Sequence, residues 1–580
     1  VVAYTTFDTA NVTGAANFTV TGNLSVDGGT IKLDGNYPVG TGNVALGDAA
    51  MNGSISGNYN TAVGQVAGTA LTSGTKNAFF GSYTADANTT GSNNTAIGQA
   101  AFSANTTGGN NTAVGNDALL SNTTASNNTA VGYQSLETNT TGASNVAVGY
   151  KTLEANTTAN SNTAAGFAAM AANTTGASNT AFGREALLDN TTGASNVAMG
   201  REALANNTTA SYNTALGYQA GLNATTGSVN TFVGGLSAGF GVVTGSHNVG
   251  LGAETLYRLT SGGSNVSIGY QALQFNTTGS SNVAIGREAL ENNTSGNVNT
   301  ATGHNALLTN TTGFENTASG ANSLKLNTTG YYNSSFGSGS LLSNTTGIQN
   351  TAVGRYALIS NTTASNNTAV GYQAGNAITT GVDNTLIGRS TGSHENDLIS
   401  GCCNVLVGAY TATTTTNANY AMALGYNLDA AAGYTTFGEA ANDIRAAHGN
   451  TTWNTVSDQR YKKDIVDSTA GLSFVNALQP RTFKYKTLGE LPETFNAYEA
   501  DSTEVFKNSV TNHGFIAQEV KAAIDAHPEL KDGFAMWGER PDGGQEIGEA
   551  ALIPMLVKAV QELSATNDAL VARITALEGA

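Results

Sequence analysis

A short pattern of polar and apolar positions recurs through about two thirds of the chain. Between Asn43 and Gly425 the pattern Asn, Thr or Val, Ala, apolar, Gly occurs 23 times. Twenty of the 22 intervals between successive pattern glycines are 17 residues, and the step from Gly234 to Gly252 is 18. A period this regular is typical of a solenoid, in which each unit buries its apolar surface against the next one.

The last positions before the glycine predict a short strand with two unlike faces. The residue directly before the glycine is large and apolar in 20 of the 23 copies, and the residue before that is Ala in 16. Neighbouring residues of a strand point to opposite faces, so one face packs bulky groups and the other requires close approach. Seventeen residues cannot bury both faces alone, so we expect each unit to stack on its neighbours and on other chains.

The rest of the unit predicts a corner and a second apolar patch. The tetrad Asn105–Gly108 (NTTG) indicates a corner, because Asn tolerates left-handed conformations and Gly accepts them freely. The pair Ala118–Leu119 indicates a short strand or one helical turn. Stacked Asn and Thr side chains should form hydrogen-bonded ladders along the axis. The Asn-Thr-Thr triplets also match N-glycosylation sequons, but their fixed place in the period favours corner chemistry over a glycosylated stalk.

These patterns predict a mainly β protein with several domains. We expect a parallel β-solenoid or β-roll shaft of 17-residue repeats over residues 43–388, assembled as a homotrimer and followed by a C-terminal α+β domain. Residues 1–42 alternate as short strands between glycines and predict a β-collar or attachment segment. In residues 389–456 the period loosens, which predicts an irregular distal end of the shaft.

Five aromatic residues in this distal segment are candidates for binding glycans of a host surface. Aromatic rings at an exposed tip suit stacking on sugar rings, although rings that cap the solenoid core would give the same pattern. The candidates are Tyr410, Tyr420, Tyr426, Tyr434 and Trp453.

Charge separates the repeats from the C-terminal segment. The chain has a net charge of −17, a pI near 4.7 and no basic cluster, so we expect no nucleic-acid partner. Residues 457–580 hold 31 of the 63 charged residues, which predicts a domain boundary near Ser457. Cys402 and Cys403 suggest no disulfide framework and are interpreted as small buried strand residues. The six His show no metal spacing, and no apolar run is long enough to insert in a membrane. We expect no metal and no cofactor.

Two motifs in the C-terminal segment carry specific information. The first is Ser457–Ile465 (SDQRYKKDI), and the second is His513–Val520 (HGFIAQEV). Between them lie Ala470–Leu472 and a strand pattern, and a helix follows. This order resembles the endosialidase-type intramolecular chaperone at the C-terminus of phage tail fibres and tailspikes, over essentially all of residues 457–580.

The resemblance implies a module that trimerises a fibre, helps its β-rich part to fold and then cuts itself off. The implied cleavage site lies between Val456 and Ser457, and the implied catalytic Ser-Lys dyad maps to Ser457 and Lys462. Further motif positions are Asp458, Arg460, Gln518 and Glu519. A Ser hydroxyl needs a base, and a Lys can serve where burial favours its neutral form. In the alternative reading, Lys462 and Lys463 form a solvated basic face and Ser457 caps a helix.

The final helix shows heptads over residues 553–580, which predict a coiled coil. An Asn at an a position costs stability but fixes register and oligomeric state. Ile at a with Leu at d favours a dimer, so the trimer rests on the resemblance, and a helix packed within its own domain is the alternative. The a positions are Ile553, Val560, Asn567 and Ile574, and the d positions are Leu556, Leu563, Leu570 and Leu577.

Together these features predict a trimeric tail fibre for host attachment, with enzymatic activity limited to one self-cleavage per chain. We expect other virion proteins and a host glycan or protein as partners, and a location in the virion after synthesis in the host cytoplasm. A trimeric bacterial surface adhesin and a glycan depolymerase are alternatives. The repeats lack a recurring carboxylate pair of the kind that glycosidases use, and Glu185, Glu202 and Glu288 follow Arg, which predicts surface ion pairs.

Overall fold

The chain forms two compact units, residues 1–456 and residues 457–580. The computed structural model describes residues 40–238, 241–393, 397–440, 442–450, 454–455, 459–530 and 534–579. Nearly all of the predicted β-collar therefore lies outside the described residues.

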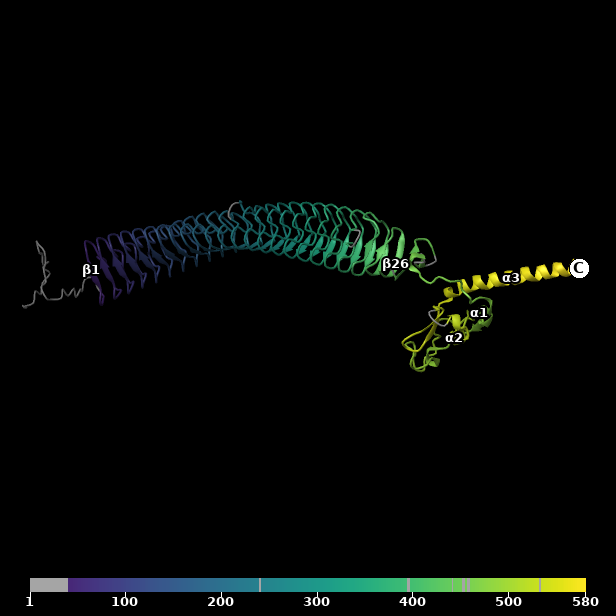
Figure 1. Ribbon diagram of the computed structural model, residues 1–580. Coiled ribbons are helices and arrows are strands. Elements are labelled where there is room, and N and C mark those ends of the chain that lie inside the picture. Colours follow the sequence, from purple (N-terminus) through teal and green to yellow (C-terminus); the bar gives the residue numbers. More distant parts are fainter. Residues whose placement is uncertain are drawn as a thin grey trace, which may run out of the picture. The chain divides into compact units, whose positions relative to one another are not determined.

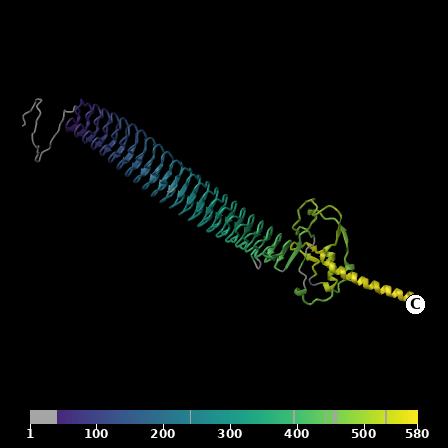
Figure 2. The ribbon, with the colours of Figure 1, turned by 90° about the horizontal axis from the view of Figure 1, so that it is seen from above.

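The first unit contains a parallel β-solenoid, seen from two directions in Figures 1 and 2. Each coil contributes one strand of three residues. Each strand residue pairs with the equivalent residue of the next coil, so that Ile97 lies beside Val114. The stacked strands are β1 (Val44–Leu46), β2 (Thr61–Val63), β3 (Ala78–Phe80), β4 (Thr95–Ile97), β5 (Thr112–Val114), β6 (Thr129–Val131), β7 (Val146–Val148), β8 (Thr163–Ala165), β9 (Thr180–Phe182), β10 (Val197–Met199), β11 (Thr214–Leu216), β12 (Thr231–Val233), β13 (Val249–Leu251), β14 (Val266–Ile268), β15 (Val283–Ile285), β16 (Thr300–Thr302), β17 (Thr317–Ser319), β18 (Ser334–Phe336), β19 (Thr351–Val353), β20 (Thr368–Val370), β21 (Thr385–Ile387) and β22 (Val405–Val407). This arrangement confirms the predicted mainly β solenoid of 17-residue repeats.

The stack continues into the segment predicted to be irregular. Strands β24 (Met422–Tyr426) and β26 (Tyr434–Glu439) add to it in parallel, and β27 (Asn442–Ala447) and β28 (Asn454–Thr455) follow as antiparallel strands. Short strands β23 (Ala412–Thr413) and β25 (Asp429–Ala430) pair separately.

The two faces of each strand differ as the sequence predicts, and the structure decides which one is inside. In β4 the small Ala96 is fully buried, whereas the bulky Ile97 beside it is 42% exposed. The same alternation holds along the stack, with a buried middle residue in every strand from β2 to β22. The middle position therefore faces the coil interior, whether it holds a small residue such as Ala96 or a large one such as Phe79 or Phe232, and the residue before the glycine faces outward.

The Ala-Leu pair forms neither a strand nor a helical turn. Ala118 and Leu119 are both fully buried, and Leu119 has a φ of 52°, in the left-handed region. A strand would send two successive side chains to opposite faces. The left-handed turn at Leu119 instead lets both side chains enter the interior, so this expectation from the sequence was wrong.

Asparagine ladders run inside the solenoid, as predicted. In the first ladder the Asn128 backbone N–H donates to Asn111 Oδ1 at 2.9 Å, and this bond recurs from coil to coil between Asn43 and the last coils. In the second ladder Asn105 Nδ2 donates to Asn88 Oδ1 at 2.6 Å. The second ladder is interrupted where Ala224 replaces the next Asn, which leaves Asn207 Oδ1 buried without a hydrogen-bond partner, and it runs again from Asn276 to Asn361.

The chain bends at the Asn-Thr-Thr-Gly tetrad, as predicted, but without the expected left-handed residue. Asn105 is fully buried and uses its amide for the ladder, so the structure confirms corner chemistry over a glycosylated stalk. The left-handed residues lie elsewhere in the coil, at Ala100, Phe102 and Asn110. Asn105 Nδ2 also donates to Gly108 O of its own turn at 3.2 Å, so the amide supports the corner without a left-handed backbone at Asn105.

The second unit combines short helices with two small hairpins around its own core. The hairpins are β29 (Arg481–Phe483) with β30 (Asn512–Gly514) and β31 (Trp537–Glu539) with β32 (Gln545–Ile547). The helices are η1 (Gln459–Tyr461), α1 (Leu472–Ala477), η2 (Leu488–Glu490), α2 (Ala517–Asp525), η3 (Pro528–Leu530), η4 (Glu549–Leu552) and α3 (Ile553–Glu578). Phe474, Val520, Met536 and Met555 lie in the core that joins α1, α2 and α3.

Candidate functional site

Glu519 of the second chaperone motif forms an ion pair with Arg481, a residue that the sequence did not single out. Glu519 lies in the first turn of α2, and its two carboxylate oxygens accept hydrogen bonds from Arg481 of β29 at 2.7 and 2.9 Å. These bonds lower the pKa of the Glu519 carboxyl and raise the pKa of the Arg481 guanidinium. Gln518 is exposed beside Glu519. A paired carboxylate of this kind fixes α2 against the β29–β30 hairpin.

Arg481 was missed because nothing in the sequence connects it to Glu519. It directly follows Pro480 and precedes the predicted strand, 38 residues before its partner. The available signal was an Arg at a strand start, upstream of a motif that contains a carboxylate. Pairing across that separation depends on the path of the chain.

The first chaperone motif is described only in part. Arg460 and Lys462 are exposed, and the Lys462 backbone N–H donates to Gln459 O at 3.0 Å where η1 ends. The predicted cleavage site and nucleophile, Val456 and Ser457, lie outside the described residues, as does Asp458. The distance between the two members of the predicted dyad is therefore not defined, and their roles stay a prediction.

The predicted heptad seam is exposed along α3. Its seven apolar members are each between 41% and 77% exposed, and Asn567 is exposed as well. A different face of the helix packs on the domain, through the buried Met555 and Ala559. Glu562 of α3 accepts a hydrogen bond from the Leu472 backbone N–H at 2.7 Å, which ties α3 to the start of α1. Attachment to the domain thus leaves the seam available.

A second exposed apolar surface runs along the length of the solenoid. We call it the outer column, defined as the large apolar residues directly before the pattern glycines. Because the strands pair in parallel with a shift of one repeat, these side chains lie above one another from coil to coil. The most exposed members, at 38–56%, are Leu46, Phe80, Ile97, Val148, Phe182, Met199, Leu216, Ile285, Phe336, Val353, Ile387 and Leu424.

Charged and aromatic residues directly after the pattern glycines form another row. Tyr150 stacks between Tyr133 and Phe167, with ring centroids 5.4 and 5.1 Å away. The guanidinium of Arg184 continues this row 5.7 Å from the Phe167 ring. The aromatic side chains of this row therefore stack face to face from coil to coil.

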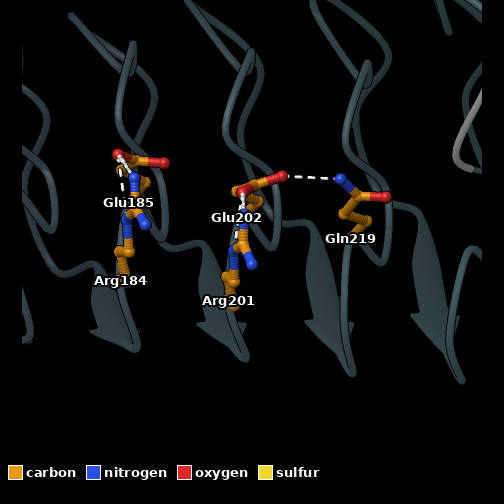
Figure 3. Close-up of polar contacts among 5 residues, drawn as sticks. All are labelled: Arg184, Glu185, Arg201, Glu202 and Gln219. Atoms are coloured by element: carbon orange, nitrogen blue, oxygen red, sulfur yellow. Dashed lines mark hydrogen bonds and ion pairs between the residues drawn. The ribbon is translucent and has the colours of Figure 1, made fainter.

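The predicted Arg-Glu surface pairs are present and appear in Figure 3. Arg184 contacts Glu185 at 2.9 Å, and Arg201 contacts Glu202 at 2.7 Å. Gln219 of the following coil donates to Glu202 at 2.6 Å, which lowers the pKa of this carboxyl together with Arg201. The third predicted pair joins Arg287 and Glu288 at 2.7 Å. These carboxylates are therefore engaged in ion pairs, as the sequence indicated.

The candidate aromatic residues of the distal segment are distributed over separate places. The rings of Tyr410 and Tyr426 meet edge to face at 6.1 Å, and Arg389 lies 5.2 Å from the Tyr410 ring. Tyr434 lies 5.5 Å from the guanidinium of Arg445. Tyr420 is 60% exposed, and Trp453 lies outside the described residues.

The two cysteines differ from the expectation of buried strand residues. Both are half-buried in the turn before β22, with their Sγ atoms 3.1 Å apart. The contact with Cys402 and burial raise the pKa of the Cys403 thiol. Cys403 has a φ of 63°, which places the pair in a corner rather than in the ladder.

In the part of the chain that the structure describes, no helix combines the length and apolarity required to cross a bilayer. Within the same residues, His, Cys, Asp and Glu side chains form no group of three that could hold a metal ion.

Comparison with known proteins identifies the second unit. The family model described as chaperone of endosialidase matches residues 457–528. No curated protein and no solved structure matches the chain. The family match confirms the resemblance drawn from the two motifs, and the C-terminal unit carries an endosialidase-type chaperone domain. A β-solenoid followed by this domain fits a protein of the phage tail-fibre or tailspike type.

Proposed function

We propose that the chain is a homotrimeric virion fibre for host attachment, assembled by its C-terminal chaperone domain. The carrying observation is the outer column, which leaves large apolar side chains exposed in coil after coil. Each buried Å² of apolar surface contributes about 25 cal/mol, so a column this long strongly favours burial against further chains. Further copies of the same chain supply a column of the same period and length.

The exposed seam of α3 supports the same partner in the second unit. Its apolar residues repeat with heptad spacing over the helix, as in helices that associate with copies of themselves. Three copies is the number that the chaperone family implies. Formation of a homotrimer would thus bury both exposed apolar surfaces of the chain, the outer column of the first unit and the seam of α3 in the second.

The solenoid also has a physical need for a chaperone. Most coils hold three residues other than glycine in the left-handed region, such as Asp117, Leu119 and Asn127, and a few have a glycine at one of these positions. Such a conformation costs about 1–2 kcal/mol per residue in the absence of neighbouring contacts. A first coil is therefore costly to form, and nearly identical coils can pair one repeat out of register at little cost. A C-terminal trimeriser would start all chains in phase.

In this proposal the chaperone domain then separates by cleavage between Val456 and Ser457. Lys462 is exposed in the single chain, and a neutral Lys base requires burial. We therefore expect cleavage only after assembly. The released shaft would attach to a host surface glycan or protein through its distal segment and to other virion proteins through residues 1–42.

Intact and native mass spectrometry of the wild-type chain, Ser457→Ala and Lys462→Ala tests the proposal. The expected wild type is a trimer of chains that end at Val456, with both variants trimeric and full length. Full-length trimers in all three samples would refute cleavage of the chain and support the trimeric fibre. A wild-type monomer would refute the trimeric fibre.

A further inference from the structure

We propose that an aromatic corner on the side of the solenoid, formed by Phe314, Tyr331 and Tyr332, binds an uncharged glycan. Phe314 and Tyr331 stack with centroids 4.7 Å apart and planes at 6°. Tyr332 stands nearly perpendicular to both rings, at 5.4 and 5.1 Å. The inference deepens the proposed function, on which it rests, by assigning a place and a ligand class to attachment.

This corner departs from the chemistry of the repeat. In several coils a Ser or Asn at the position of Phe314 accepts a hydrogen bond from a backbone N–H of the preceding coil, as Ser126 Oγ does from Gly109 N at 3.0 Å, and in others this position holds a small residue such as Ala143 or Ala177. The bond recurs between Ser211 and Ala194 and between Ser280 and Gly263.

Three successive coils place the bulky residues Phe314, Tyr331 and Ile348 at this position, and the side chains of Phe314 and Ile348 have no hydrogen-bond acceptor. The column resumes with Ser365, which accepts from Ile348 N at 3.0 Å. The run of three bulky residues therefore sets these coils apart from those with Ser, Asn, Gly or Ala at this position.

The exposure of the corner suits a ligand rather than a core. Phe314 and Tyr331 are half-buried, and Tyr332 is 45% exposed with a φ of 58°. The Tyr332 backbone N–H donates to Phe314 O at 3.3 Å, which holds the perpendicular ring against the stacked pair. Rigid aromatic groups supply contact area with little loss of conformational entropy. The apolar C–H face of a pyranose ring can therefore pack on this corner.

Polar neighbours define the ligand class. Glu315 and Gln349 occupy the position of Tyr332 in the coils before and after it, and both are exposed. Their carboxylate and amide groups can bond sugar hydroxyls from either side of the ring. The Glu315 carboxylate repels carboxylated or sulfated sugars, which is consistent with the net charge of −17. Neutral hexose or N-acetylhexosamine units fit this arrangement.

An array of purified neutral and acidic bacterial polysaccharides, probed with the full-length chain, tests the inference. We expect the wild type to bind at least one neutral polysaccharide, with roughly tenfold weaker binding in Tyr331→Ala and Tyr332→Ala. The matched control is Tyr212→Ala. Tyr212 occupies the same coil position as Tyr332 and is 66% exposed, but its neighbours in that position are Ser195 and Val229. The control should bind like the wild type.

Native mass of every variant separates this inference from the proposed function. Variants that remain trimeric and bind as tightly as the wild type would refute the glycan site and leave the fibre intact. Loss of the trimer in Tyr332→Ala would also refute it, because the corner would then be a contact between chains. Absence of binding to every neutral polysaccharide, or loss confined to Tyr420→Ala in the distal segment, would overturn it as well.

Discussion

Glu519 of α2 and Arg481 of β29 form a two-pronged ion pair, in which Nη2 and Nε of the guanidinium donate to the two carboxylate oxygens. Planar, bidentate contacts of this kind are geometrically specific. The pair joins two elements whose paired residues lie 38 positions apart within the family-matched segment 457–528. It therefore gives the second motif of the chaperone a structural role in holding the helix to the hairpin.

This pair predicts a pH dependence for the chaperone domain. Because the pKa of Glu519 is lowered in the folded chain, its contribution to stability is present above the ordinary Glu range and is lost as pH falls through the lowered pKa. Glu519→Gln should thus destabilise the domain near neutral pH and flatten its acid transition. Urea unfolding followed at a series of pH values measures this. Glu529→Gln on η3 is the control, and identical pH profiles for both variants would contradict the prediction.

The glycine column predicts that a single methyl group disrupts the stack. Gly115 has a φ of +140°, and a Cβ there would lie 2.3 Å from Gly132 O in the next coil. Gly115→Ala should therefore destabilise the coils around it by about 2 kcal/mol or more. Hydrogen exchange of peptides from neighbouring coils measures the local effect.

Gly235 provides the matched control for this substitution. A Cβ at Gly235 meets nothing within 4 Å, and Ala already stands at the corresponding position of the next coil, Ala253. Gly235→Ala should change stability by no more than about 0.5 kcal/mol. Equal protection in the two variants would show that the glycine column is not required.

The buried asparagine ladder predicts a cost for removing one member. Asn156 Nδ2 donates to Asn139 Oδ1 at 2.8 Å, and Asn156 Oδ1 accepts from Asn173 Nδ2 at 3.0 Å. Asn156→Ala leaves a buried acceptor and a buried donor without partners, which should cost about 3 kcal/mol. Thermal unfolding should show the loss. The control is the exposed Thr141→Ala, and a similar midpoint in both variants would count against the ladder.

The seam of α3 predicts a position-specific effect on assembly. Leu563 is 56% exposed in the single chain, so an Asp there leaves the domain folded but places a charge in a helix interface. In the uncleavable Ser457→Ala background, Leu563→Asp should reduce the trimer fraction in native mass spectra. Ala569→Asp introduces the same charge at an exposed position outside the seam. Equal loss of trimer in both would point to net charge rather than to the seam.

The sequence by itself determined the period, the strand positions, the ladders and the chaperone domain. These follow from local spacing, because a parallel stack of identical units must repeat its strand, its glycine and its Asn at one interval. The Arg-Glu pairs of the shaft were equally predictable, since the partners are adjacent in the chain. The two chaperone motifs could be recognised for the same reason, as each is a short continuous run.

Only the tertiary structure decided which strand face is inside and where the chain turns. Alternation predicts two faces, but the exposure of Ile97 and the burial of Ala96 depend on the direction in which the chain turns to close the coil. The left-handed Leu119 that buries its side chain beside Ala118 has no signature in residue type, because Leu disfavours that conformation and adopts it only under tertiary contacts. The pairing of Arg481 with Glu519 and the meeting of Phe314 with Tyr331 and Tyr332 likewise require the path of the chain, which brings distant or successive coils together in space.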